Sequence, residues 1–297
     1  MKNIKQILCF GSLNIDYIYK VRSIVRPGET IRSLSINRNA GGKGSNQSMA
    51  AVKAGATVHH AGKIGNDGEW MLDEMMASGI NVSNIEISSS VSGHAVIQVD
   101  DAGENAICLF GGTNRSLTRE YIDSVLNSYA SDTVLMLQNE VNEIPYLIQQ
   151  GLKRNMPICL NPSPITDELL SLDLTLVDII IVNELEGCAL SGLKEPYEII
   201  QKLHAQYPKG IVILTLGSRG SIAIKPGDNE PIVIPSESCD CIDSTAAGDT
   251  FAGYVLAGLT MGHDLEIVLT HASRAAEHCV GISGAQSSIP FRSELNL

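Results

Sequence analysis

The stretch "DIIIVNELEGCAL" (178–190) contains the local pattern on which the fold prediction depends. Its first part, 178–182, is an apolar run of strand length, and a segment with helical spacing follows over 184–190. Such a run is typical of a strand that is buried on both faces. Strands of this kind, alternating with helices, indicate a mainly parallel sheet that helices cover on both sides.

The same alternation runs along most of the 297-residue chain. Further strand-like runs lie at 7–10, 133–137, 157–160 and 210–216, and helical spacing recurs at 44–55, 68–78, 141–153, 195–207, 247–260 and 264–280. Two regions, 16–42 and 93–112, alternate polar and apolar residues and read as strand pairs. Neither is long enough to form a domain. We therefore predict one three-layer α/β/α domain over 1–297, with a small antiparallel β-sheet lid formed by about 16–40 and 93–112.

Composition excludes several classes of protein. The net charge of −12 argues against nucleic-acid binding, and no apolar run is long enough to cross a membrane. Seven cysteines, an odd number, favour reduced thiols in a cytoplasmic protein. Cys239 and Cys241 would share one face of a strand, but two further metal ligands are missing nearby. We expect small molecules as partners.

The motif "DSTAAGDTF" (243–251) opens the helical segment at 247–260. Aspartate is favoured at helix N-termini because its side chain caps the helix. A helix N-terminus also attracts anions, and small residues let the backbone approach a phosphate closely. A carboxylate would repel that anion unless the chemistry needs it. Asp249 is therefore either a helix cap or a catalytic acid or base.

Three motifs offer groups that suit a sugar. "AGGKGSNQ" (40–47) is not a phosphate-binding loop of the Walker type, because Lys43 is followed by glycine, and it is not a dinucleotide fingerprint. It leaves exposed backbone N–H groups and the Asn46 amide, or else a glycine-rich turn with a helix cap. "GSLNID" (11–16) and "LQNE" (137–140) both end strands with polar side chains, which suit a polyol or a simple turn.

Two motifs suit a nucleotide. In "VNELEG" (182–187), Asn183 is a plausible helix cap, and an Asn with a Glu near a phosphate site would also hold hydrated magnesium. "TLGSRGS" (215–221) ends a strand with glycines and small polar residues, in a shape that suits either the back of a nucleotide or an ordinary hairpin turn.

These motifs, taken in order, resemble the ribokinase family of sugar kinases, in the phosphofructokinase-B superfamily. The resemblance rests on "GSLNID", "AGGKGSNQ", "VNELEG", "TLGSRG", "DSTAAGDTF" and "GAQSSIP" (284–290), and it covers essentially the whole chain. "AGGKGSNQ" and "TAAGDTF" are highly specific together. The resemblance implies a three-layer α/β domain with a β lid that phosphorylates D-ribose at its 5-hydroxyl, using ATP and magnesium.

The resemblance also implies roles for particular residues. Asp249 looks like the catalytic base, and the N–H groups of Ala246, Ala247 and Gly248 look like the anion hole for the transferred phosphoryl group. The sugar-binding positions are Asn14, Asp16, Gly42, Lys43, Asn46 and Glu140, with Asp249. The nucleotide-binding positions are Asn183, Glu186, Thr215, Gly217, Ser218, Gly220 and Gly248, where Glu186 holds magnesium through water. A potassium-like ion is implied at Asp243, Thr245, Ser288 and the carbonyls of Cys279, Ile282 and Gly284.

Members of this family clasp their lids together, so the resemblance also implies a homodimer. Two residues depart from the family pattern. His94 stands in a lid strand where a small or apolar residue is more common, and Arg115 in "GGTNRS" (111–116) stands where an uncharged residue is usual. If Arg115 faced the sugar it would favour an anionic substrate, and otherwise it lies at a solvated edge of the lid.

Three alternatives stay open beside a kinase for ribose. A related kinase would act on deoxyribose, another pentose, a ketose or a nucleoside, although a nucleoside needs an apolar cleft for its base. A non-catalytic sugar-binding protein would gain nothing from a carboxylate beside phosphate. An NAD-dependent oxidoreductase is disfavoured because the dinucleotide fingerprint is missing.

Overall fold

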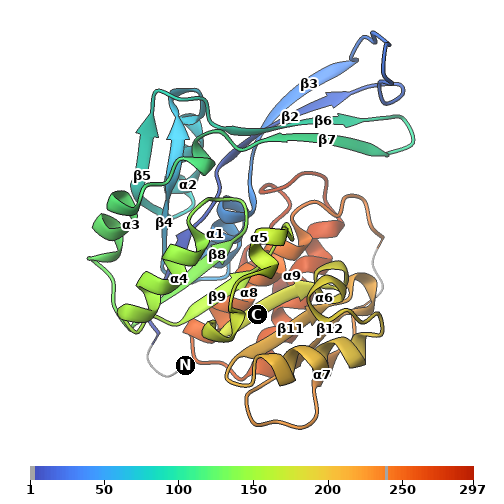
Figure 1. The fold of residues 1–297 in the computed structure, drawn as a ribbon. Helices are drawn as coiled ribbons and strands as arrows, with labels where there is room; N and C mark the ends of the chain where they lie inside the picture. Colours follow the sequence, from blue (N-terminus) through green and yellow to red (C-terminus); the bar gives the residue numbers. More distant parts are fainter. Residues whose placement is uncertain (1–3, 238–239) are drawn as a thin grey trace.

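A computed structural model describes residues 4–237 and 240–297, so Cys239 lies outside the described residues. The described chain forms two sheets, and the larger one has nine strands in the order β13-β12-β11-β10-β9-β8-β1-β4-β5 (Figure 1). The strands are β1 (Gln6–Phe10), β4 (Val58–Gly65), β5 (Asn81–Ser88), β8 (Thr133–Gln138), β9 (Ile158–Asn161), β10 (Ile179–Asn183), β11 (Ile211–Thr215), β12 (Ser221–Ile224) and β13 (Ile232–Ile234). All neighbours from β11 to β5 pair in parallel, whereas β12 pairs antiparallel with both β11 and β13.

Helices cover both faces of the large sheet, which confirms the three-layer prediction. One face packs against α1 (Lys43–Lys53), α2 (Trp70–Ala77), α8 (Ala247–Thr260) and α9 (Leu265–Val280). The other face packs against α3 (Arg119–Leu126), α4 (Ile144–Lys153), α6 (Glu184–Ser191) and α7 (Pro196–Gln206). The short helix α5 (Asp167–Leu170) follows β9. None of the helices within the described ranges is long and apolar enough to cross a membrane.

The elements β4, β5 and α3 were not predicted from the sequence. The strand β4 has two histidines and three of its eight residues are Gly or Lys, yet most of it is buried. Both ring nitrogens of His60 find partners, Nδ1 at 2.8 Å from Ser48 Oγ and Nε2 at 3.2 Å from the Gly11 carbonyl oxygen, and burial lowers the His60 pKa to about 4, so the ring is neutral. The strand β5 lies at the sheet edge and is polar. Periodicity in the sequence misses strands whose burial depends on such distant partners.

The smaller sheet is the projecting lid, with strand order β3-β2-β6-β7 (Figure 1). Its strands are β2 (Asn14–Lys20), β3 (Ser35–Gly41), β6 (Gly93–Val99) and β7 (Asn105–Phe110). The two predicted strand pairs are antiparallel hairpins, but β2 and β6 run parallel. The prediction of a purely antiparallel lid was therefore wrong. Both hairpins leave the body in the same direction, since Asn14 at the start of β2 pairs with Gly93 at the start of β6.

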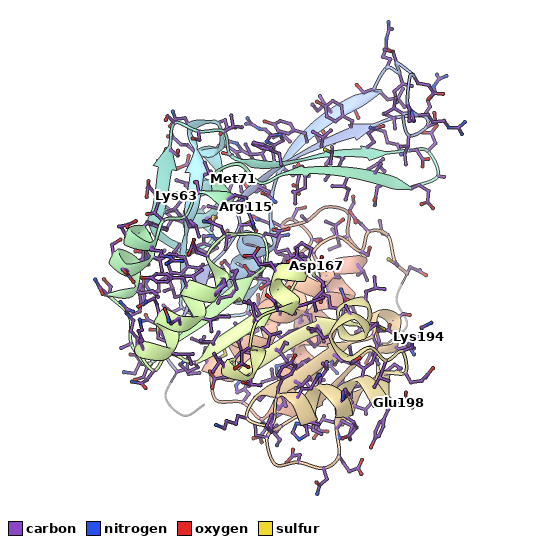
Figure 2. All side chains as sticks on the ribbon, in the orientation of Figure 1. Lys63, Met71, Arg115, Asp167, Lys194 and Glu198 are labelled. Atoms are coloured by element: carbon purple, nitrogen blue, oxygen red, sulfur yellow. The ribbon has the colours of Figure 1, made fainter. Side chains whose placement is uncertain are left out.

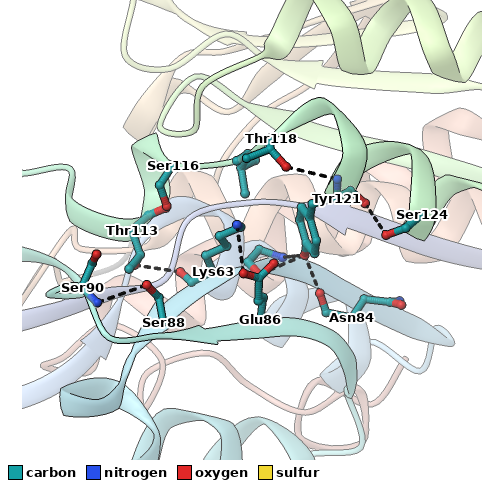
Figure 3. Close-up of polar contacts among 12 residues, drawn as sticks. Lys63, Asn84, Glu86, Ser88, Ser90, Thr113, Ser116, Thr118, Tyr121 and Ser124 are labelled. Carbon is teal, nitrogen blue, oxygen red and sulfur yellow. Dashed lines mark hydrogen bonds and ion pairs between the residues drawn. The ribbon is translucent and has the colours of Figure 1, made fainter.

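Polar contacts join the segment after β7 and helix α3 to the strands β4 and β5 at one edge of the large sheet (Figure 3). Thr113 Oγ1, just after β7, donates to the Lys63 carbonyl at 2.9 Å. On α3, the Tyr121 hydroxyl accepts from Gly62 N at 2.8 Å, and its single hydrogen lies within reach of the carbonyls of Gly62 and Asn84. The Thr113 bond fixes the segment after β7 to β4, and the Tyr121 bonds fix α3 to the backbone of β4 and β5.

Candidate active site

Asp249 lies in the first turn of α8, after the N-cap residue Ala246. Among the described residues, no side-chain hydrogen bond caps this helix. The Asp249 carboxylate instead accepts hydrogen bonds from α1: Asn46 Nδ2 lies 3.1 Å from Oδ2, and Gln47 Nε2 lies 2.9 Å from Oδ1. Only 6% of Asp249 is exposed. The interpretation of Asp249 as a helix cap is therefore wrong.

A glycine allows α1 and α8 to lie close enough for these bonds. A Cβ at Gly253, one turn after Asp249, would lie 2.5 Å from Ala50 Cβ and 2.6 Å from the Gln47 carbonyl oxygen. Real Cβ atoms do not approach other atoms so closely, so any larger residue would push the helices apart. The close packing of α1 on α8 thus brings Asn46 and Asp249 together.

Backbone N–H groups gather beside this carboxylate. Ala246 has a left-handed φ of 62°, which is unusual for a residue with a Cβ and turns the chain into α8. The first N–H groups of a helix have no partner within it and form the positive end of its dipole. Ala247 N–H makes only a long bond of 3.3 Å to the Ser244 carbonyl. A Cβ at Gly248 would meet no described atom within 4 Å, so this backbone borders open space.

Asn14 is the first residue of β2 and is almost fully buried. Its Oδ1 accepts a hydrogen bond of 2.7 Å from Asn114 Nδ2, and Asn114 Oδ1 accepts from Leu13 N at 2.9 Å. The second bond determines which end of the Asn114 amide faces Asn14. Sequence reasoning missed Asn114, since nothing in its local pattern distinguishes it from a turn residue.

Glu140 lies against the glycine-rich loop before α1. Its Oε2 accepts hydrogen bonds from Lys43 N at 2.9 Å and from the Ser12 hydroxyl, while Ser12 Oγ accepts from Gly44 N at 3.2 Å. The pKa of Lys43 is raised, chiefly by the negative charge of Asp249 and also by Glu140, which outweighs the effect of burial. Lys43 is therefore a protonated cation whose charge is favoured by two predicted site carboxylates. Ser12 was not predicted.

Asp16 lies two residues after Asn14, on the same face of β2. No described residue donates a hydrogen bond to its carboxylate, and burial together with the charge of Glu140 raises its pKa to about 7. Gly41 on the neighbouring strand leaves the room it occupies, because a Cβ there would lie 2.0 Å from Asp16 Oδ2. Gly42 follows with a left-handed φ of 94° and turns the chain into α1. The predicted sugar-binding residues thus lie near one another.

The two residues that depart from the family pattern do not lie with Asp16. Strand pairing puts Asp16 opposite Ala95, so His94 points to the other face of the lid, where its ring packs against Tyr17 and Phe110. Arg115 lies beyond the lid strands (Figure 2), is exposed, and donates to the Val141 carbonyl at 3.1 Å. Its position agrees with a solvated edge.

A cavity of about 440 Å³ lies on the other side of the α8 N-terminus. Its lining includes six predicted residues: Thr215, Gly217, Ser218, Gly220, Ala247 and Gly248. Phe251 on α8 and Ala276 and Val280 on α9 give it an apolar wall. Its size and apolar lining suit a purine base, and its polar end lies at the helix N-terminus.

Asn183 and Glu186 form a capping box at the start of α6. Asn183 Oδ1 accepts from Glu186 N, and Glu186 Oε2 accepts from Asn183 N, both at 2.9 Å. The capping interpretation of Asn183 is therefore confirmed. Asn183 pairs with Thr215 on β11, so the box stands next to the cavity. Within the described residues, Glu186 Oε1 has no hydrogen-bond partner and stays available.

The residues implied for a monovalent cation come from the segment before α8 and from the end of α9 with the loop that follows it, and the two parts meet. Asp243 Oδ1 accepts from Thr245 N at 2.9 Å, and Oδ2 accepts from Gly284 N at 3.0 Å. Cys279 Sγ lies 3.0 Å from Ser288 Oγ and 3.6 Å from the Thr245 carbonyl. Ile282 N donates to the Cys279 carbonyl. Burial acts to raise the pKa of Asp243, but its hydrogen bonds outweigh burial, so its pKa is lowered.

Within residues 4–237 and 240–297, no three His, Cys, Asp or Glu side chains are grouped closely enough to bind a metal ion. A site built from carbonyl oxygens or from water ligands does not need such a group.

Comparison with known proteins identifies the class. Residues 4–292 match the pfkB family of carbohydrate kinases, and the chain belongs to this family. Its sequence is 33% identical over 302 residues to a ribokinase of Haemophilus influenzae, covering 98% of this chain and 97% of the relative.

Solved structures of ribokinases have the same fold. The ribokinase of Cryptococcus neoformans var. grubii in complex with ADP superposes with a TM-score of 0.85 at 33% identity, covering 98% of this chain and 99% of that one. The ribokinase of Arabidopsis thaliana complexed with ribose and ATP also gives 0.85, at 26% identity, with 98% and 97% covered. The predicted ribokinase-like fold is thereby confirmed.

Proposed function

We propose that this protein is an ATP-dependent ribokinase that phosphorylates the 5-hydroxyl of D-ribose, with Asp249 as the base. One observation carries the proposal: a buried carboxylate stands between a group of sugar-type ligands and a nucleotide-sized cavity, at the N-terminus of α8. Ribokinases are among the relatives and structural neighbours, and one neighbour binds ribose and ATP.

The carboxylate suits proton transfer. As the ribose oxygen attacks the γ-phosphorus of ATP, an O–P bond forms, the bond from that phosphorus to the β,γ-bridging oxygen breaks, and ADP leaves. Asp249 takes the hydroxyl proton. Negative charge spreads over the transferred phosphoryl oxygens, and the N–H groups at the start of α8 face that charge. Both donors to Asp249 are side-chain amides, which donate hydrogen bonds but do not transfer a proton to the carboxylate.

Unpaired acceptors suit the sugar. Asn46 Oδ1 is buried without a hydrogen-bond partner in the described chain, and the Asp16 carboxylate likewise lacks a donor. Buried polar atoms without partners cost free energy, and the hydroxyl groups of a bound ribose would pair with them. Asn14, Gly42, Lys43 and Glu140 complete the proposed sugar site. We keep the proposal that 1–297 is one domain and that 16–40 and 93–112 form its lid over the sugar.

The proposed nucleotide site uses Thr215, Gly217, Ser218, Gly220 and Gly248. Glu186 fits a magnesium ion held through water, because its free oxygen is a hard ligand and the capping box fixes its side chain. When bound with ATP, magnesium supplies positive charge that neutralises the phosphates.

A potassium-like ion fits the two loops at 243–245 and 279–288. The group offers the ionised Asp243, Thr245, Ser288 and backbone carbonyls, and these oxygen atoms suit a large hard cation. Cys279, Ile282 and Gly284 would contribute carbonyls. The segment 243–245 leads directly into α8 and is bonded to Cys279 and Gly284, so an ion here would support the backbone N–H groups of the anion hole.

Two further predictions belong to the proposal. The lid carries exposed Leu34, Ile36, Ile107 and Leu109, and a projecting apolar sheet is normally covered, so we propose a homodimer through the lids. We also keep the prediction of a cytoplasmic protein, because the enzyme needs ATP and the six described cysteines are free thiols.

An assay of ADP release tests the proposed function. The panel contains D-ribose, 2-deoxyribose, another pentose, a ketose and a nucleoside, each with ATP and magnesium. We expect D-ribose to give the highest kcat/KM. Highest activity on another sugar would establish the related-kinase alternative, and ribose binding without any ADP release would establish a non-catalytic binding protein.

The Asp249→Asn variant tests the base. Loss of a general base predicts a fall in kcat of about 10²- to 10⁴-fold. The thermal midpoint should stay near that of the parent, since the Asn46 amide can turn its unpaired Oδ1 toward the new side-chain N–H. Asp264→Asn, at the exposed N-cap of α9, is the matched control. A kcat within about threefold of the parent would remove Asp249 from the chemistry.

A further inference from the structure

Asp249 is the end of a buried network of side-chain amides. Gln47 Nε2 donates to Asp249 Oδ1 at 2.9 Å and to Asn161 Oδ1 at 3.0 Å, while Gln47 Oε1 accepts from Gln138 Nε2 at 2.7 Å. Gln47 is 1% exposed and Gln138 is also 1% exposed. These three bonds therefore use both hydrogens of the Gln47 amide and its oxygen.

The network fixes which end of Gln47 faces Asp249. Asn161 Nδ2 donates to the Ile181 carbonyl at 2.9 Å, so Asn161 Oδ1 must face Gln47 and needs an N–H from it. The same Gln47 nitrogen then supplies its second hydrogen to Asp249. A carboxylate cannot donate a hydrogen bond. In the opposite orientation of the amide, Gln47 Oε1 would therefore face two other acceptors, Asp249 Oδ1 and Asn161 Oδ1.

The network ties the end of a helix to the centre of the large sheet. Gln138 is the last residue of β8, Asn161 is the last residue of β9, and Gln47 lies in the first turns of α1. On its far side, Gln138 lies 3.8 Å from the buried thiol of Cys9 on β1. Asp249 Oδ1 is thus held by groups that three parallel strands position. Oδ2 instead pairs with Asn46, a proposed sugar ligand.

We infer that Gln47 is a positioning residue, which holds Asp249 Oδ1 so that Oδ2 faces the substrate hydroxyl and receives its proton. The inference rests on the proposed function, because it needs Asp249 to act as the base. Gln47 itself does not touch the sugar in this arrangement. It acts through the orientation of the carboxylate, and a misplacement of about 1 Å at a reacting group costs up to about 100-fold in rate.

The test is a double-mutant cycle between Gln47→Leu and Asp249→Asn. Leucine keeps roughly the volume of the side chain and removes the hydrogen bond to Asp249 Oδ1, while the bond from Asn46 to Oδ2 remains. We expect Gln47→Leu to lower kcat by about 10- to 100-fold, with the KM values for ribose and ATP within about threefold of the parent. In the Asp249→Asn background, Gln47→Leu should lower kcat by less than about threefold further, because there is no longer a base to position.

Gln150→Leu is the matched control. Gln150 is a similarly buried glutamine on α4, remote from the site, whose Oε1 accepts from Arg154 Nη1 at 2.9 Å. It should leave kcat within about twofold of the parent. A second variant, Gln138→Leu, releases the Gln47 amide without removing its contact with Asp249, and we expect it to give a smaller loss in kcat than Gln47→Leu. It decides the matter if Gln47→Leu does not fold.

The outcomes separate this inference from the proposed function. If Asp249→Asn retains activity, the base itself is wrong. If Asp249→Asn is inactive but Gln47→Leu or Gln138→Leu keeps the parent kcat, only the positioning role is overturned. Equal losses from Gln47→Leu in both backgrounds, or a loss that appears in KM rather than kcat, would also overturn it, since either indicates a general structural role.

Discussion

Replacing Asp16 by asparagine is expected to stabilise the protein while it weakens sugar binding. The Asp16 carboxylate lies on the sugar-facing side of β2, close to the backbone of Gly41, and receives no hydrogen bond from the described residues. Burial and the charge of Glu140 raise its pKa from an ordinary 3.8 to about 7. In the unliganded protein, this group resists ionisation, and a bound sugar would supply the missing donors.

The pKa gives the magnitude and the sign of the effect. Because the folded pKa lies above the unfolded one, folding is favoured when Asp16 is protonated, and this stability is lost as pH rises from about 4 through 7. Relative to a side chain that does not titrate, Asp16 lowers the free energy of unfolding by about 4 kcal/mol at pH 8 and by about 1.5 kcal/mol at pH 5. Asparagine does not titrate. The gain in free energy of unfolding from Asp16→Asn should therefore be about 2.5 kcal/mol greater at pH 8 than at pH 5. For a chain of this size, that corresponds to about 5 °C in thermal midpoint.

The assay is thermal unfolding of parent and Asp16→Asn at pH 5 and pH 8 without ligand, with ribose affinity measured by calorimetry at pH 8. Asp101→Asn, an exposed aspartate in a lid turn, is the matched control and should show the same midpoint difference at both pH values. A difference between parent and Asp16→Asn that does not change with pH would refute the reasoning. Unchanged ribose affinity would remove Asp16 from the sugar site.

Three other predictions follow from the site and the lid. Activity should be higher in potassium than in sodium chloride at equal ionic strength, and equal rates would exclude the ion from the mechanism. The protein should sediment as a dimer at micromolar concentration through 16–40 and 93–112, and a monomer would contradict the lid contact. Ala276→Trp should place a large ring in the 440 Å³ cavity from its apolar wall. It should raise the KM for ATP at least about tenfold and leave the KM for ribose unchanged. Similar increases in both values would place the nucleotide elsewhere.

The regular part of the fold was predictable because its signals are local. The helix predicted over 247–260 has those bounds in the structure, and the strand at 178–182 lies within one residue of β10. Buried parallel strands such as β10 are apolar along their whole length, so a short window detects them. By contrast, β4 contains His59 and His60 and is stabilised by partners far away in the chain, so no short window could have detected it.

The site was predictable only as far as its motifs reach. The first-turn position of Asp249 allowed both a cap and a base, and the choice depended on Asn46, which lies 203 positions earlier. Ser12, Gln47 and Asn114 were missed because they orient other site residues through hydrogen bonds, and such roles leave no spacing pattern in the sequence. The parallel pairing of the two lid hairpins is likewise a contact between distant segments, which turn residues do not specify.

The bond between Asn46 and Asp249 also has a consequence for biosynthesis. A chain emerging from the ribosome contains α1 long before α8, so the face of α1 that α8 covers stays exposed during most of translation. That face includes Ala50 and Ala51, which lie against Gly253 of α8 and are buried in the finished protein. A prematurely terminated chain would therefore be an aggregation-prone fragment rather than a weak enzyme. Catalytic competence arises only when about the last fifty residues have docked, and nascent chains of this protein should depend on chaperones until then.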